Sequence, residues 1–106
     1  MPIEHPLPRA EAQRLIRRLA LTPGAIYQRG HCREQMRKRR IDAAELERVL
    51  RNGEVNEPAY KRSDEWRYKV EASSGGDLVA VTVIVLDTML HIHTVYRARK
   101  RAKVTP

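Results

Sequence analysis

The sequence predicts an α+β domain in which N-terminal helices pack on one face of a roughly four-stranded antiparallel sheet. Two observations support this. Apolar residues recur at helical spacing in the first half of the 106-residue chain, and at a spacing of two from Glu54 onward. The links between the strand-like segments are short, which favours antiparallel neighbours. We therefore expect helices first and then about four strands that follow one another in the sheet.

The length indicates a single domain, because 106 residues can build one hydrophobic core but not two. Residues 1–8 contain three prolines and no periodicity, which predicts a flexible lead-in or a strap across the surface. We expect the domain to occupy residues 9–97 and a basic tail to follow at 98–106. Five of the seven residues from 97 to 103 are Lys or Arg.

The first helix is indicated by four apolar residues at helical spacing, Ala12, Leu15, Ile16 and Leu19. The sequence Thr-Pro-Gly at 22–24 ends it, and residues 25–27 read as a short extended piece. A second helix is expected to open near His31, with Gly30 as the pivot before it.

The third helix has clear boundaries. Asp42 can serve as its N-cap, with Glu45 three residues later as the capping-box partner. Ile41 and Leu46 have the spacing of a hydrophobic staple. Gly53 supplies a C-terminal stop.

The strands follow from residue 55. One is expected at 55–61, and one at 66–71, where Trp66, Tyr68 and Val70 alternate with charged residues. A glycine-rich turn at 73–77 leads into the apolar segment 78–86, which is typical of a central strand. A turn at 87–88 precedes the last strand at 89–96.

The composition limits the classes of molecule that the protein is expected to bind. The net charge of +8 and the pI near 10.3 favour an anionic partner, either nucleic acid or an acidic protein. The single cysteine, Cys32, excludes an internal disulfide framework and fits a reducing compartment. No apolar run approaches the roughly 18 residues that a membrane span needs, and no signal peptide is visible. We therefore expect a soluble cytoplasmic protein without a membrane partner.

The strongest functional signal lies at residues 29–40, where six of twelve residues are Lys or Arg and His31 stands near the start. Fixed positive charge beside a group that titrates near neutral pH suits phosphate binding or phosphate chemistry. A solvated helix face has the same composition, so this pattern leaves both interpretations open.

The segment from His31 to Ile41, with the capped helix and Gly53 after it, resembles a bacterial family of unknown function with the signature His-Ala-x-x-Arg-Met-x-x-Arg-Gly-Ile. His31, Met36, Arg39 and Ile41 match, whereas Cys32, Gln35 and Arg40 depart from it. The resemblance extends over residues 15–96, to a closing Thr-Val-Tyr. It implies a RelE-like fold and kinship with toxin ribonucleases of the RelE, barnase and colicin kind, which cleave RNA without a metal or cofactor. It also implies an acidic antitoxin-like partner protein.

Such cleavage requires a base, an acid and cations, as the RNA 2′-hydroxyl attacks the adjacent phosphorus. The candidate catalytic residues are His31, Arg39, Arg67, Tyr96 and His93. The candidate RNA-contacting residues are Arg33, Arg37, Lys38, Arg40, Lys69, His91, Arg99 and Lys100. With five aromatic residues and no Phe, the sequence favours recognition by shape and phosphate contact over base stacking.

Structural interpretations compete with these. His31 can simply cap its helix, and Arg39 can form a buried ion pair with Glu45 or Glu71. Trp66 and Tyr68 have the spacing of core residues.

The pair His91 and His93 can chelate zinc, but a third ligand is missing nearby, so we expect no metal site. The pair fits a second acid-base candidate on the sheet face that the helices leave open. The alternative function is a non-catalytic basic module that binds nucleic acid or an acidic protein.

Overall fold

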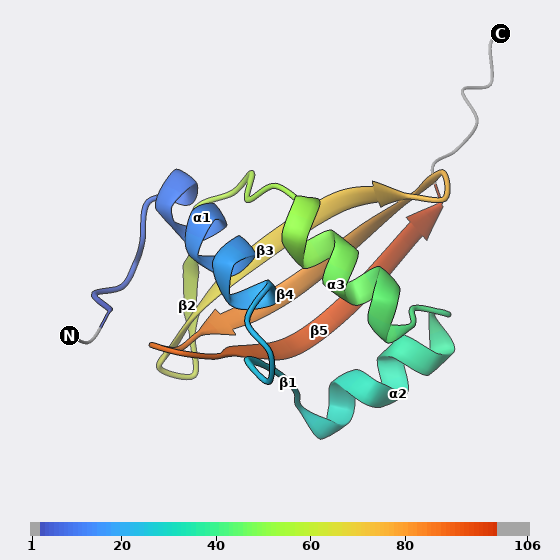
Figure 1. Ribbon diagram of the computed structural model, residues 1–106, viewed down its shortest axis with the longest axis horizontal. Helices are drawn as coiled ribbons and strands as arrows, with labels where there is room; N and C mark the ends of the chain where they lie inside the picture. The colour runs from blue at the N-terminus through green and yellow to red at the C-terminus, as the bar shows by residue number, and fades with distance from the viewer. Residues whose placement is uncertain (1–2, 100–106) are drawn as a thin grey trace, which may run out of the picture.

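The computed structural model describes residues 3–99. Its elements, in order, are α1 (Arg9–Ala20), β1 (Ile26–Gln28), α2 (Gly30–Lys38), α3 (Ala43–Asn52), β2 (Tyr60–Arg62), β3 (Glu65–Ser74), β4 (Asp77–Val85) and β5 (Leu90–Arg99) (Figure 1). The predicted α+β class is confirmed. The expected order of helices followed by strands also holds, apart from the short strand β1 between α1 and α2.

The sheet has five strands in the order β1-β5-β4-β3-β2, so the expectation of four antiparallel strands was wrong. The short segment at 25–27 forms β1, which pairs parallel with β5. The short-link rule could not reveal this pairing, because the two strands are far apart in the sequence. The strand expected at 55–61 is reduced to β2, and Glu54 makes only an isolated bridge with Glu71.

Two helices cover one face of the sheet, as Figure 1 shows for α1 and α3 in front of the strands. They bury the predicted apolar stripes, including Ile16 of α1 and Leu50 of α3, against alternate residues of β4 such as Val81 and Val83. The predicted placement of Tyr68 in the core is confirmed, and Trp66 packs against its edge. The face opposite α1 and α3 is called the open face below.

The second helix does not lie on that covered face, contrary to the expected packing of all the helices. Strand β1 pairs with β5 only at residues 90–92, and beyond this point α2 lies along the edge of β5 (Figure 1). The side-chain oxygen of Gln35 accepts a hydrogen bond from the Val95 amide at 3.2 Å. An edge strand leaves backbone N–H groups without partners. Where β1 no longer pairs with β5, the Gln35 side chain supplies a partner for one of these groups.

The predicted N-cap of α3 is confirmed, but the capping box is not closed. The Asp42 carboxylate accepts from the Glu45 amide at 2.7 Å. The Glu45 carboxylate accepts instead from Ser74 at 2.5 Å and from Arg97. Arg97 also donates a hydrogen bond to the Asp77 carboxylate, at 3.0 Å.

Arg97 is therefore held inside the fold, in strand β5, which continues past the expected end at Tyr96 to Arg99. The arginine that Glu45 binds is thus Arg97 rather than Arg39, contrary to the ion pair considered from the sequence.

Gly53 ends α3 for a reason that the sequence does not give. Its φ of −73° is one that any residue adopts, so the position does not need a left-handed glycine. A Cβ added there would lie 2.6 Å from the Val70 methyl Cγ1 and 2.9 Å from the Glu71 carbonyl oxygen. Glycine is required because the end of the helix approaches β3 closely.

The described part of the lead-in contacts the sheet at Tyr68. The Tyr68 hydroxyl accepts from the Leu7 amide at 2.8 Å and lies 2.6 Å from His5 Nδ1. Burial raises the pKa of Tyr68. Ile3 and Leu7 pack against the edge of the core, so residues 3–8 run as a strap on the helix-covered side.

Candidate functional site

The open face carries many polar side chains because the strands alternate, although Ala80 and Ile84 of β4 also lie on it. In β3, Tyr68 and Val70 point into the core, so Arg67 and Lys69 lie on the opposite face, as the spacing predicts. In β5, Leu90 and Ile92 are buried in the core, which places His91 on the open face. Positive and titratable side chains from two different strands thus share one surface.

His93 occupies an irregularity in the sheet. Thr82 of β4 pairs with Thr94, whereas the next residue, Val83, pairs with Ile92. His93 is therefore an extra residue in β5, a β-bulge. Bulges bend a strand and redirect a side chain, and they occur often beside functional sites.

Arg67 is the most buried charged residue described, with 8% of its surface exposed. Within residues 3–99 its Nε has no hydrogen-bond partner. A buried donor left without a partner costs about 1–3 kcal/mol, and more when the group is charged. Arg17 Nε also lacks a partner among these residues, so the missing hydrogen bond alone does not mark a ligand site, whereas the positive charge of Arg67 on the open face favours an anion beside it.

Arg29 and Glu65 border this cluster. The Arg29 guanidinium binds the Glu65 carboxylate with both nitrogens, at 3.2 and 2.9 Å. This hydrogen bonding lowers the pKa of Glu65 and raises the pKa of Arg29. Arg29 also approaches His91 Nδ1 at 3.4 Å. The tilted rings of Tyr27 and His91 lie 5.0 Å apart, so the aromatic contact extends the cluster to β1.

These surroundings set the protonation of His93. Burial lowers the pKa of His93, and the positive charge of Arg67 and then of Arg29 lowers it further. Glu65 acts in the opposite sense, and His31 adds to the lowering. The imidazole is therefore neutral at pH 7 and can accept a proton. The influence of His31 shows that α2 brings this residue into the same electrostatic environment.

Gln35 orients His31. While its oxygen holds the Val95 amide, the Gln35 amide nitrogen lies 3.1 Å from His31 Nε2. Because these two residues stand one turn apart on α2, the contact fixes the exposed imidazole relative to the edge of β5. Gln35 thus joins the helix to the sheet.

Two other predicted catalytic residues pair with one another further along β5. The Arg39 guanidinium lies over the Tyr96 ring, 5.1 Å from its centroid. Tyr96 follows His93 by three residues, which is on the order of 10 Å at about 3.3 Å per residue. Beside this pair, Arg39, Arg40, Asp77 and Arg97 line a polar hollow of about 520 Å³.

The predicted RNA-contacting residues are spread more widely. Arg33, Arg37, Lys38 and Arg40 are exposed around α2, and Lys38 lies 3.6 Å from Glu34. Lys69 is on the open face, 3.9 Å from Glu57. Arg99 is the last residue of β5, and Lys100 lies outside the described residues.

The structure thus brings together His31, His93, Arg67 and His91, and places Arg39 with Tyr96 beside them. Sequence reasoning missed Arg29 and Glu65. The alternation of β3 could have placed Glu65 on the face of Arg67, but its pairing with Arg29 required the tertiary fold.

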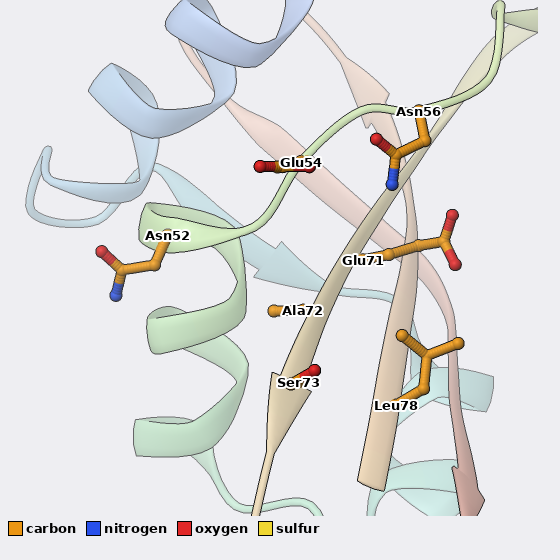
Figure 2. Close-up of a pocket in the computed structure, with 7 residues that line it drawn as sticks. All are labelled: Asn52, Glu54, Asn56, Glu71, Ala72, Ser73 and Leu78. Carbon is orange, nitrogen blue, oxygen red and sulfur yellow. The ribbon is translucent and has the colours of Figure 1, made fainter. Parts of the chain in front are cut away.

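A different hollow, of about 410 Å³, lies where α3 and the segment after it meet β3. Figure 2 shows that its lining includes Glu54 and Glu71, while the Asn52 and Glu71 side chains point in opposite directions. Its charged side chains are both acidic and do not converge on one point. It is therefore a poor site for an anion.

The chain was searched for a metal site and a membrane span, and compared with known proteins. Among residues 3–99, no three His, Cys, Asp or Glu side chains are grouped as a metal ion would require. No helix in this range is long and apolar enough to cross a membrane. No curated protein and no solved structure was found to match the chain.

A family match was found. Residues 29–97, which are 69 of the 106 residues, match the family described as Domain of unknown function (DUF4258). The match begins at Arg29 and ends at Arg97, so it contains α2, α3 and the cluster on the open face apart from Tyr27. Membership of a family of unknown function, expected from the signature, is confirmed, and the chain belongs to this family.

Proposed function

We propose that the open face binds RNA and cleaves its backbone without a metal ion, as toxin-like ribonucleases of the RelE, barnase and colicin kind do. In this proposal the protein is the toxin of a toxin–antitoxin pair, and an acidic antitoxin-like protein covers the basic surface. The observation that carries the proposal is His93 on its bulge, held neutral beside the Arg67 guanidinium on the open face.

The chemistry assigns one role to each group. Neutral His93 accepts the proton of the RNA 2′-hydroxyl while the 2′-oxygen forms a bond to phosphorus. The bond from phosphorus to the 5′-oxygen breaks, and His31 donates a proton to that oxygen. The products are a 2′,3′-cyclic phosphate and a 5′-hydroxyl end. General acid-base help of this kind contributes on the order of 10²- to 10⁴-fold.

Arg67 stabilises the charge that builds up on the phosphoryl oxygens. Its guanidinium is largely removed from water, where a hydrogen bond to an anion is stronger than at the surface. Arg29 is already held by Glu65, which balances its charge, so its role is to contact and orient His91. The two arginines therefore support the reaction in different ways.

The experiment is cleavage of a mixed-sequence RNA by the purified protein in EDTA, with binding measured in parallel on 2′-O-methyl RNA, which lacks the attacking hydroxyl. His93→Gln should slow cleavage by about 10²-fold or more and leave the dissociation constant nearly unchanged. His5→Gln is the matched control, because His5 lies on the strap against Tyr68, and it should cleave like the wild type.

Two results would overturn the proposal. One is a wild-type protein that does not cleave in EDTA, which with salt-dependent binding leaves the alternative of a basic binding module. The other is equal cleavage by wild type and His93→Gln, which would remove His93 from the mechanism.

A further inference from the structure

The exposed tyrosines gather on the open face. Of the four tyrosines, Tyr68 is buried in the core, while Tyr27, Tyr60 and Tyr96 are 49%, 43% and 52% exposed. Tyr27 contacts the His91 ring, and Tyr60 pairs with Arg67 across β2 and β3. Tyr96 follows the core residue Val95, so it also lies on the open face.

Two of these rings are at the ends of a single row across the sheet. Register pairs Tyr60 with Arg67, Ile84 with His91, and His91 with Tyr27. Tyr68 pairs with Val83, so the preceding residue, Arg67, is opposite Ile84 and completes the row. Four strand spacings separate Tyr60 from Tyr27, about 19 Å. A cation, the buried Ile84 and an imidazole lie between the two aromatic ends.

Each exposed ring also has a positive neighbour. Arg39 lies over Tyr96, Arg67 is paired with Tyr60, and Arg29 approaches the His91 ring that Tyr27 contacts. Aromatic and cationic groups on one surface suit a nucleic-acid strand, which carries both flat bases and phosphates.

We infer that the open face accepts single-stranded RNA rather than duplex, with bases stacked on Tyr27, Tyr60 and Tyr96. This inference rests on the proposed RNA-binding function and specifies its substrate. The small number of aromatic residues had favoured shape and phosphate contact. We revise that expectation here, because the topology collects three of the five aromatic residues on the face that carries His93 and Arg67.

A duplex offers no free base faces to stack on these tyrosine rings. In an A-form helix the bases are paired and stacked inside, so a protein meets phosphates, 2′-hydroxyls and the shallow groove. The flat faces of the bases become available only in single strands, loops and bulges. Tyrosines presented on a sheet therefore discriminate by strandedness and tolerate different sequences.

The test measures binding of a fluorescent 2′-O-methyl RNA, single-stranded or annealed to its complement, at two salt concentrations. The wild type should prefer the single strand. Each of Tyr27→Leu, Tyr60→Leu and Tyr96→Leu should weaken single-strand binding roughly 5- to 150-fold and bind duplex as before. Their salt dependence should stay that of the wild type, because stacking releases no counterions.

Phenylalanine substitutions at the same positions are the matched controls and should retain affinity, since the ring remains. Leu21→Ala removes an exposed apolar side chain at the end of α1 and should have no effect. Equal binding of single strand and duplex, or leucine variants that bind like the wild type, would overturn the inference while leaving ribonuclease activity possible. A wild type that neither binds nor cleaves RNA would overturn both proposals.

Discussion

Gly53→Ala tests the close approach of α3 to β3. The new methyl group would lie against the Val49 carbonyl oxygen, the Val70 side chain and the Glu71 carbonyl oxygen. Two of these three contacts are backbone atoms, which cannot turn away as a flexible side chain would. The end of the helix must therefore move from the strand, and the isolated bridge between Glu54 and Glu71 moves with it.

The expected cost follows from these contacts. Forcing one additional methyl group into a packed site costs about 1–3 kcal/mol. Replacing glycine also lowers the conformational entropy of the unfolded chain, which offsets about 0.4–1 kcal/mol of this cost. The free energy of unfolding should fall by about 1–2 kcal/mol. For 106 residues the unfolding entropy is about 0.22 kcal/mol/K, so Tm should drop by about 5–9 °C.

The assay is thermal unfolding followed by circular dichroism, with Gly30→Ala as the matched control. Gly30 is the first residue of α2, and no described atom lies within 4 Å of the Cβ that alanine would add. This control should keep or raise Tm, because alanine favours a helix. A Gly53→Ala variant as stable as the wild type would refute the reasoning about close packing.

Three further predictions concern α3, β5 and the site. Asp42→Ala removes the N-cap and should lower the free energy of unfolding by about 1 kcal/mol in urea, with an unchanged m-value; no shift in the midpoint would contradict the cap. Arg97→Met removes the closer arginine from the partly buried Glu45 carboxylate, which keeps only Arg48 at 3.9 Å, and should cost about 1.5–3 kcal/mol in the same assay; a change within error would show that the pair of Arg97 with Glu45 is not stabilising. His93 acts as a base when neutral, so cleavage should decline only below the ordinary histidine pKa of 6.5. Glu65→Gln removes a charge that raises the pKa of His93, so this decline should move to still lower pH, and a move to higher pH would argue against His93 as the base.

Local patterns predicted the helices and the long strands. The apolar stripe of α1, the N-cap Asp42 and the alternation around Tyr68 depend on neighbours within a few residues, so the sequence contains the whole signal. Strand β1 was not identified as part of the sheet, because three residues give no period. Its parallel pairing with β5 joins segments more than sixty residues apart.

In the candidate site, too, local sequence predicted some features and long-range contacts set the others. The sequence indicated His31, His93 and Arg67, since residue type and strand alternation suffice to nominate them. It did not indicate the bulge at His93, which depends on how β4 and β5 pair, or the ion pair of Arg29 with Glu65.

What the sequence by itself determined is the α+β class, the positive charge and the polar face of β3, because composition and short-range periodicity set them. Only the tertiary structure decided that α2 lies along the edge of β5, that Arg97 binds Glu45, and that three tyrosines share a surface with His93. The reason is physical. These contacts join residues distant in the chain, and strand pairing chooses them by satisfying backbone hydrogen bonds and burying the core.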